Sequence, residues 1–374
     1  MRSTVERARA LCLKLGDTQE LIRAYDGLFN YYFSHSQPET LLRYAGEMSD
    51  VGQKTGNPQA FIMARKMSGF ANLLLGHFEA ATEDMQLLVE TYNGVRDGQA
   101  ALAVRDPKMG AHTVLGICRT ALGYLDSGAA ESLEAVQYAD SLNHTVSQTV
   151  ALRRACVQHI MRRDTRTVAE LSERLLGLTA EFETFKGARD GAIFNCWAKL
   201  QTRNDPVLLE RMRKSIEQFD ATQHWALLPF FMTAAAEIIG RYGDRDGATA
   251  LLDRAAALVQ STGERWCESE IMRLQAQFSA RDPEHALRLL AASLKIARQQ
   301  QARLWELRTA TSLATIYLEQ GDPQAGYDVL APVFAWFTEG LTTPDLAAAR
   351  AVLDCLEEGL DERPARMPLS STGS

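Results

Sequence analysis

The sequence predicts an all-α protein, an α-α superhelix (solenoid) of about eight helix pairs with a period near 40 residues. Two consecutive segments, residues 263–300 and 302–341, show the repeat in one register. Trp266 and Trp305 lie 39 residues apart and each opens a helical run. Apolar residues elsewhere recur at helical spacing, and no stretch alternates between β-branched and polar residues as a half-buried strand does. Together these patterns indicate a helical repeat array, in which each unit packs on its neighbours.

The break between the two helices of each pair can be placed along the whole chain. The successive breaks are 40, 47, 40, 41, 39, 38 and 40 residues apart, and they lie near Pro38, Phe78, Leu125, Thr165, Pro206, Arg245, Pro283 and Pro323. Six of the seven steps lie between 38 and 41 residues, which unrelated helices would not produce. We assign the 47-residue step to an insertion at residues 93–108.

Turn chemistry supports this register. Asp205-Pro206, Asp282-Pro283 and Asp322-Pro323 each place an N-cap acceptor before a proline at the first helical position. Proline is favoured there because its missing N–H would have no helical partner in any case. The segment GDRDG at residues 243–247 lacks the glutamate that completes a calcium loop, so we interpret it as a helix–helix turn.

Small residues just inside the second helices indicate close helix packing, as in tetratricopeptide repeats, whose common unit is 34 residues long. These residues are Ala80, Ala248, Ala286 and Ala325. At the ends of the chain, residues 2–15 are expected to form the second helix of an incomplete pair, and residues 343–358 a closing helix. We therefore predict one solenoid domain over residues 1–358 and a disordered tail over residues 359–374.

Composition restricts the function. The net charge of −7 repels phosphate backbones on average, so nucleic-acid binding is not expected. A basic cluster is interpreted as a solvated helix face; it contains Arg153, Arg154, Arg162, Arg163 and Arg166. The six cysteines stand singly and are interpreted as small buried hydrophobes. Residues 1–18 lack a signal-peptide core and no segment is long and apolar enough to span a membrane, so we expect a cytoplasmic protein.

No recognised catalytic, cofactor or metal motif occurs. The sequence contains no phosphate-binding loop, no dinucleotide fingerprint, no zinc-protease helix and no nucleophile elbow. The seven histidines fall in different helix pairs, away from metal-ligand spacing. Tryptophans that open repeat helices are expected in the core, and Trp225 is the one expected to be partly exposed. The sequence therefore predicts no enzyme, no cofactor and no metal.

Nearly the whole chain resembles a known family. The segments GERWCESEIMRLQAQF and ELRTATSLATIYLEQGDPQAGYDVLAPVFAWFTEGLTTPDLAAARAVLD are similar to the C-terminal tetratricopeptide-like region of large bacterial signalling proteins that carry a predicted ATPase. Those proteins have an adenylate/guanylate cyclase domain or a winged-helix DNA-binding domain in front of it. The resemblance implies a regulatory scaffold, and it carries over no catalytic residue because the catalytic domains lie upstream.

The leading hypothesis is a right-handed superhelix whose concave face binds a segment of another protein in bacterial signal transduction. Expected partner-binding residues lie mainly on the first helices of the pairs: Arg65, Arg153, Lys199, Trp225, Arg273 and Arg308. Two alternatives stay open. The chain could sense a small regulatory ligand, or it could be the C-terminal fragment of a larger ATPase- or cyclase-type regulator.

Overall fold

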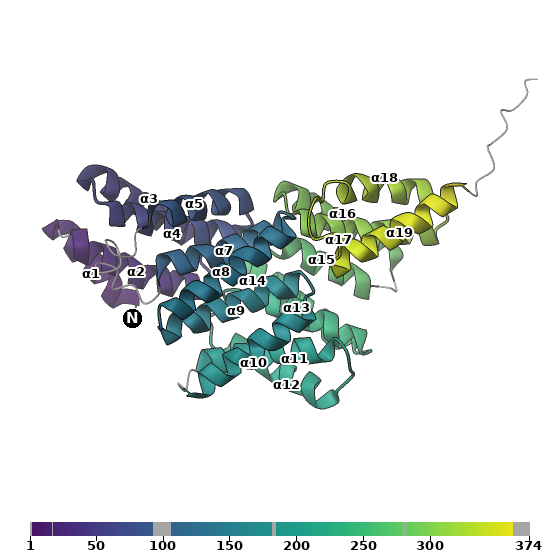
Figure 1. Cartoon of the computed structure of the whole chain (residues 1–374), viewed down its shortest axis with the longest axis horizontal. Coiled ribbons are helices and arrows are strands. Elements are labelled where there is room, and N and C mark those ends of the chain that lie inside the picture. The colour runs from purple at the N-terminus through teal and green to yellow at the C-terminus, as the bar shows by residue number, and fades with distance from the viewer. Residues whose placement is uncertain (1, 17, 93–105, 182–184, 280–281, 362–374) are drawn as a thin grey trace, which may run out of the picture.

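The structure is a computed structural model that describes residues 2–16, 18–92, 106–181, 185–279 and 282–361. Within these ranges the chain forms 18 helices and no strand (Figure 1). The first helices of the eight pairs are α2 (Thr18–Ser34), α4 (Pro58–Leu75), α7 (Pro107–Ala121), α9 (Thr145–Met161), α11 (Phe185–Leu200), α13 (Leu228–Arg241), α15 (Glu268–Phe278) and α17 (Arg303–Glu319). The second helices are α3 (Pro38–Thr55), α5 (Phe78–Thr91), α8 (Leu125–Ser141), α10 (Thr165–Glu181), α12 (Pro206–Ala221), α14 (Arg245–Thr262), α16 (Pro283–Gln299) and α18 (Pro323–Phe334).

The second helices begin at the eight residues that the sequence marked as breaks, so the predicted repeat register is confirmed. Helix α1 (Arg2–Leu15) precedes the first pair and packs on α2, as expected for the second helix of an incomplete pair. Helix α19 (Pro344–Asp361) closes the array and extends three residues past its predicted end. Most of the insertion at residues 93–108, and residues 362–374 of the tail, lie outside the described residues.

Caps explain why these helices start where they do. The Asp205 carboxylate accepts hydrogen bonds from the backbone N–H groups of Val207 and Leu208, and Asp282 accepts one from His285. In GDRDG, Asp244 caps α14 by accepting from Gly247 N at 2.9 Å, which confirms a helix–helix turn. A side chain of this kind satisfies a backbone donor that the first helical turn leaves without a partner.

Most of the core forms one continuous cluster of buried apolar side chains from α2 to α19, and a second, smaller cluster lies between α15, α16 and α17. Trp266 and Trp305 are fully buried, and the Trp305 indole N–H donates to the Trp266 carbonyl at 3.1 Å. Trp225 is partly exposed, as predicted. Of the four small residues predicted to pack inside the second helices, Ala248 and Ala286 are buried as expected, and the other two are wrong by one residue. The helices approach at Ala81 and Gly326, whereas Ala80 is exposed and Ala325 half-buried, because the inward-facing position is the fourth of the second helix.

The superhelix closes on itself along a seam. The seam is formed by the turns of the first four pairs (residues 34–37, 74–79, 122–127 and 161–164) and by segments 226–227, 264–266, 300–308 and 336–345. For example, Arg265 N donates to Leu74 O at 2.7 Å, and Ser127 Oγ donates to Glu339 at 2.9 Å. The first three turns contact segments five or six pairs further along, so about five pairs complete one superhelical turn. Accordingly, α7 contacts α17, which follows it five pairs later, and Figure 1 shows the two helices in the same part of the molecule.

Two glycines permit close approaches at the seam. Gly123 adopts a φ of 95°, and a Cβ there would lie 2.5 Å from the Trp336 ring. Gly340 adopts a φ of 67°, and its Cβ would lie 2.6 Å from Leu125 Cβ. Both positions therefore require glycine for backbone conformation and for space.

Two other sequence expectations concern the cysteines and membrane-spanning helices. Four cysteines are buried as predicted, but Cys12 is half-buried and Cys355 is exposed. Among the described residues, no helix combines the length and the apolar character that crossing a membrane requires.

Candidate functional site

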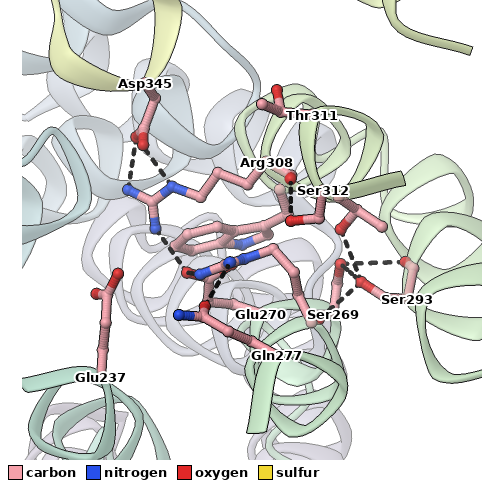
Figure 2. Close-up of polar contacts among 12 residues, drawn as sticks. Glu237, Ser269, Glu270, Gln277, Ser293, Arg308, Thr311, Ser312 and Asp345 are labelled. Atoms are coloured by element: carbon pink, nitrogen blue, oxygen red, sulfur yellow. Dashed lines mark hydrogen bonds and ion pairs between the residues drawn. The ribbon is translucent and has the colours of Figure 1, made fainter. Parts of the chain in front are cut away.

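Two clusters of arginines lie beside the seam. The first, which we call the ion network, contains Arg163, Glu237, Glu270, Arg273, Arg308 and Asp345. Figure 2 shows Arg308 held between Asp345 and Glu270, with Glu237 facing them. The Arg308 guanidinium donates to Glu270 at 2.9 Å and to Asp345 at 2.7 and 2.9 Å, and it also reaches the Met161 carbonyl. The network therefore joins the α9–α10 turn to α13, α15, α17 and α19.

The ion network balances its own charge, with three guanidiniums against three carboxylates. Burial by itself would raise the pKa of Glu237. The positive charges of Arg163, Arg273 and Arg308 outweigh this effect and lower the pKa to about 2. Burial likewise opposes ionisation of Asp345, yet Arg308 and Arg163 lower its pKa to about 2. Arg163 adds a hydrogen bond of 2.7 Å to each of these carboxylates. This arrangement is a structural clamp, because its charged groups are already paired within the chain.

The second cluster lies at the other end of the seam, around a cavity of about 60 Å³. We call it the arginine pocket, and its lining residues are Phe33, Ser34, Val150, Arg153, Arg154, Arg189, Phe219, His224, Ala226 and Leu227. Arginines from α9 and α11 thus meet the end of α2 and the α12–α13 loop. Ala226 N donates to Ser34 O at 3.3 Å, which holds the loop against α2.

Aromatic rings hold two guanidiniums of the arginine pocket. The Arg189 guanidinium carbon lies 3.6 Å from the centre of the Phe219 ring, and that of Arg154 lies 5.0 Å from Phe33. Such cation–π contacts hold a guanidinium against the face of the ring. Asp190 is fully buried, accepts from Arg189 Nε at 2.7 Å and also pairs with Arg153. Burial and the nearby Arg153 lower the pKa of Arg189 despite the opposing effect of Asp190.

A buried carboxylate, Glu264, lies beside this pocket. It accepts hydrogen bonds from Ser36 Oγ at 2.5 Å, from Leu227 N at 3.0 Å and from the Trp266 indole at 2.9 Å. Burial raises the pKa of Glu264 to about 7, although these donors and Arg154 act in the opposite direction. Glu264 therefore ties three loops of the seam together, and its charge changes near neutral pH.

The sequence-predicted partner-binding residues fall into three places. Arg273 and Arg308 lie in the ion network and are buried, and Arg273 also lines a cavity of about 600 Å³ between α15, α16 and α17. Arg153 lines the arginine pocket, and Trp225 follows His224 of the pocket in the α12–α13 loop. Arg65 and Lys199 lie apart from both clusters, facing Asp84 of α5 at 2.8 Å and Glu173 of α10 at 3.9 Å.

Sequence reasoning missed most of the arginine pocket. Arg153, Arg154 and Arg163 were assigned to a solvated face, but Arg154 is buried and Arg163 belongs to the ion network, because the seam covers this part of α9. Arg166 is exposed, as predicted. Arg189 and Asp190 carried one usable signal, an Arg-Asp pair inside an otherwise apolar helix. Within the described residues no group of three or more histidines, cysteines or carboxylates is arranged to hold a metal ion.

Comparison with known proteins places the fold. No protein-family model matches the sequence, and no curated protein matches it. Among solved structures, a Rap protein complexed with Competence and Sporulation Factor matches with a TM-score of 0.56 at 9% identity, over 92% of this chain and 100% of that chain. A signal transduction ATPase with a tetratricopeptide repeat sensor from Pyrococcus horikoshii matches with a TM-score of 0.42 at 14% identity, over 87% of this chain and 54% of that one. Yeast Tom70 matches with a TM-score of 0.36 at 11% identity, over 97% and 96%.

The helix pairs of this chain, together with the match to the Rap protein at a TM-score of 0.56, give the fold as a tetratricopeptide-like α-α superhelix, as the sequence predicted.

Proposed function

We propose that this chain is a non-catalytic interaction module of bacterial signal transduction that binds a segment of another protein on its inner face, at the arginine pocket. In this proposal residues 1–358 act as one solenoid domain and the protein works in the cytoplasm. Repeat solenoids present an extended inner surface of this kind to extended or helical segments.

One observation carries the proposal, namely the charge imbalance of the arginine pocket. In the ion network, the charged side chains already pair with one another. At the arginine pocket, Arg153 and Arg189 line the cavity and share the buried carboxylate of Asp190. A surplus of positive charge beside a cavity favours a negatively charged partner.

The fold neighbours lend limited support. The Rap protein of the same fold is described in complex with Competence and Sporulation Factor, so a solenoid of this length can hold a bound factor. The sequence resemblance to regulators with a predicted ATPase gives the proposed setting in signal transduction. It also keeps open a relationship to larger proteins with cyclase or winged-helix domains.

Affinity capture of the full chain from lysate of its own host tests the proposal. We expect a stoichiometric protein partner that Arg153→Glu loses, because the substitution reverses a charge at the pocket. Arg166→Glu is the matched control, since Arg166 is 90% exposed and lies outside the pocket. A partner retained equally by both variants would contradict the proposed location.

A second candidate is a sensor for a small regulatory ligand. The size of the cavity favours this second function, because a volume of about 60 Å³ accommodates a small chemical group rather than a length of peptide. In a thermal-unfolding screen of metabolites, this function predicts that an anionic compound stabilises the wild-type chain and has no effect on Arg153→Glu.

A further inference from the structure

The array has one helix at each end that lacks the other helix of its pair. Helix α1 packs on α2 and α3, as a second helix does, but the described residues contain no first helix for it. Helix α19 packs on α17 and α18, as a first helix does, and no second helix follows it within the described residues. Figure 1 shows α1 and α19 at opposite ends of the molecule. Each of them has an open side where the partner helix lies in a complete pair.

The open side of α1 is apolar at positions that are buried in a complete pair. Both α1 and α14 end at a glycine with a positive φ, so their residues can be matched by counting back from it. Ala255 and Leu258 of α14, eight and five residues before the glycine, are 0% and 1% exposed. The matching residues of α1 are Ala8, which is exposed, and Leu11, which is 57% exposed. Leu15, one turn further on, is 79% exposed.

The open side of α19 shows the same difference from a complete pair. The fifth, eighth and twelfth residues of α17 are fully buried, and they are Leu307, Ala310 and Ala314. Helix α18 covers this side of α17, because a Cβ at Gly326 of α18 would lie 3.1 Å from the Ala314 carbonyl oxygen. The fifth, eighth and twelfth residues of α19 are exposed, and they are Ala348, Ala351 and Cys355. Helix α19 therefore presents a strip of small side chains on the side where a second helix would pack.

The two open sides complement each other in shape. Leucines project from α1, whereas the strip on α19 consists of two alanines and a cysteine. Large side chains of one helix pack against small ones of its partner when two helices approach closely. The two helices also supply the two different positions of one pair, since α1 is a second helix and α19 is a first helix.

The two helices carry opposite net charge. Helix α1 contains four basic residues and one acidic residue, and α19 contains one basic residue and five acidic ones. In an antiparallel pair, the C-terminal half of α19, with Asp354 and Glu358, would lie beside the N-terminal half of α1, with Arg7. Some of these helices' charges already pair within the chain, as Arg9 does with Glu47. Charge of this kind therefore selects the partner and its orientation more than it adds affinity.

We propose that the chain associates head to tail with a second copy of itself, with α19 of one copy and α1 of the next forming a ninth helix pair. Two α1 helices, or two α19 helices, would face each other with like charges, which disfavours a symmetric dimer through either end. Because the contact joins two different surfaces, each added copy presents another open side, and the association continues beyond a dimer. The contact uses none of the residues that line the arginine pocket, so it does not rest on the proposed function.

Sedimentation velocity of the full chain over a range of protein concentrations tests the association. We expect the average mass to rise with concentration and to pass that of a dimer. A chain that stays monomeric at every concentration, or whose mass stops at that of a dimer, would overturn the inference.

Variants locate the contact. Leu11→Glu places a carboxylate on the open side of α1, and Ala351→Arg places a large cation on that of α19. Each is expected to weaken association by about tenfold or more, because a charge buried without a partner is costly. Both positions are exposed, so the monomer should keep its fold, which urea denaturation checks. Leu133→Glu on α8 is the matched control, since Leu133 is also 57% exposed and lies on neither open side.

Mixing the two variants tests the head-to-tail arrangement. Leu11→Glu retains an intact open side on α19, and Ala351→Arg retains one on α1. An equimolar mixture is therefore expected to form a dimer that does not grow further, while each variant alone stays monomeric. A mixture that forms no dimer, or a single variant that associates as strongly as the Leu133→Glu control, would show that α19 and α1 do not pair.

Discussion

The two arginine clusters beside the seam contain the same number of guanidiniums and behave differently. In the ion network, Arg163, Arg273 and Arg308 meet three carboxylates, and the pKa values of Glu237 and Asp345 fall to about 2. In the arginine pocket, burial instead lowers the pKa of Arg189 and raises that of Glu264 to about 7. The comparison teaches that Arg163 and Arg308 each meet two carboxylates, whereas Arg153 and Arg189 share the single carboxylate of Asp190, and we propose the second arrangement for partner binding.

Breaking the ion network should have the largest effect. Arg308→Met removes the guanidinium between Glu270 and Asp345, and we expect the free energy of unfolding to fall by about 3–5 kcal/mol, because buried carboxylates lose their partner. Urea denaturation of the pure protein measures this loss. Arg350→Met is the control, since Arg350 pairs with Asp354 at the surface and should cost about 0–1 kcal/mol. Equal losses in both variants would show that the ion network is no clamp.

Acid should weaken the ion network. Glu237 and Asp345 have folded-state pKa values near 2, below their ordinary values, so the stability they contribute is lost as the pH falls from about 4.5 to 2. The expected loss is on the order of 3 kcal/mol. Urea midpoints at a series of pH values measure it, and the Arg308→Met variant should show a shallower dependence. A wild-type midpoint that stays constant from pH 4.5 to 2 would argue against the network.

Glu264 should give the opposite pH dependence. Its folded-state pKa of about 7 exceeds the ordinary value of 4.5, so the folded protein binds more protons and stability falls as the pH rises from about 4.5 to 7. Glu264→Gln keeps an acceptor for Ser36 and Leu227 and removes the charge. We expect it to be more stable than wild type at pH 8 by roughly 1–3 kcal/mol and similar at pH 4.5. Thermal unfolding of both proteins at the two pH values measures this difference. A Glu264→Gln variant that is less stable than wild type at pH 8 would contradict the raised pKa of Glu264.

Loss of Arg189 should be the mildest change among these buried groups. Arg189→Met leaves Asp190 paired with Arg153 and relieves repulsion between two guanidiniums, so we expect a loss of about 1–2 kcal/mol, smaller than for Arg308→Met. Urea denaturation of the two variants side by side sharpens the comparison. If Arg189→Met costs as much as Arg308→Met, the arginine pocket is a second clamp.

Local signals explain what could be predicted. Each second helix begins where the sequence indicated, because proline, aspartate caps and helix-ending glycines act within a few residues of their own position. Trp266 and Trp305 are buried as expected, since their place in the repeat sets their face. The shift from Ala80 to Ala81 shows the limit of this reasoning, because neighbouring alanines differ only by the rotation of the helix.

The candidate site could not be found in this way. Arg153 and Arg308 were both expected in one groove, yet they lie in different clusters. Arg154 was expected in water because its own helix gives no sign that Phe33 of α2 covers it. The periodicity of a helix indicates on which face a residue lies, but it does not indicate which distant element packs against that face.

By itself, the sequence determined the all-helical fold, the number of pairs and the start of each second helix, since these depend on backbone conformation and hydrogen bonds over a few residues. Only the tertiary structure decided the seam and the two arginine clusters. The contact from Arg163 to Asp345 spans 182 residues and that from Arg308 to Met161 spans 147. Such pairs form because small rotations between successive helix pairs add up to a full superhelical turn, and no single repeat encodes that sum.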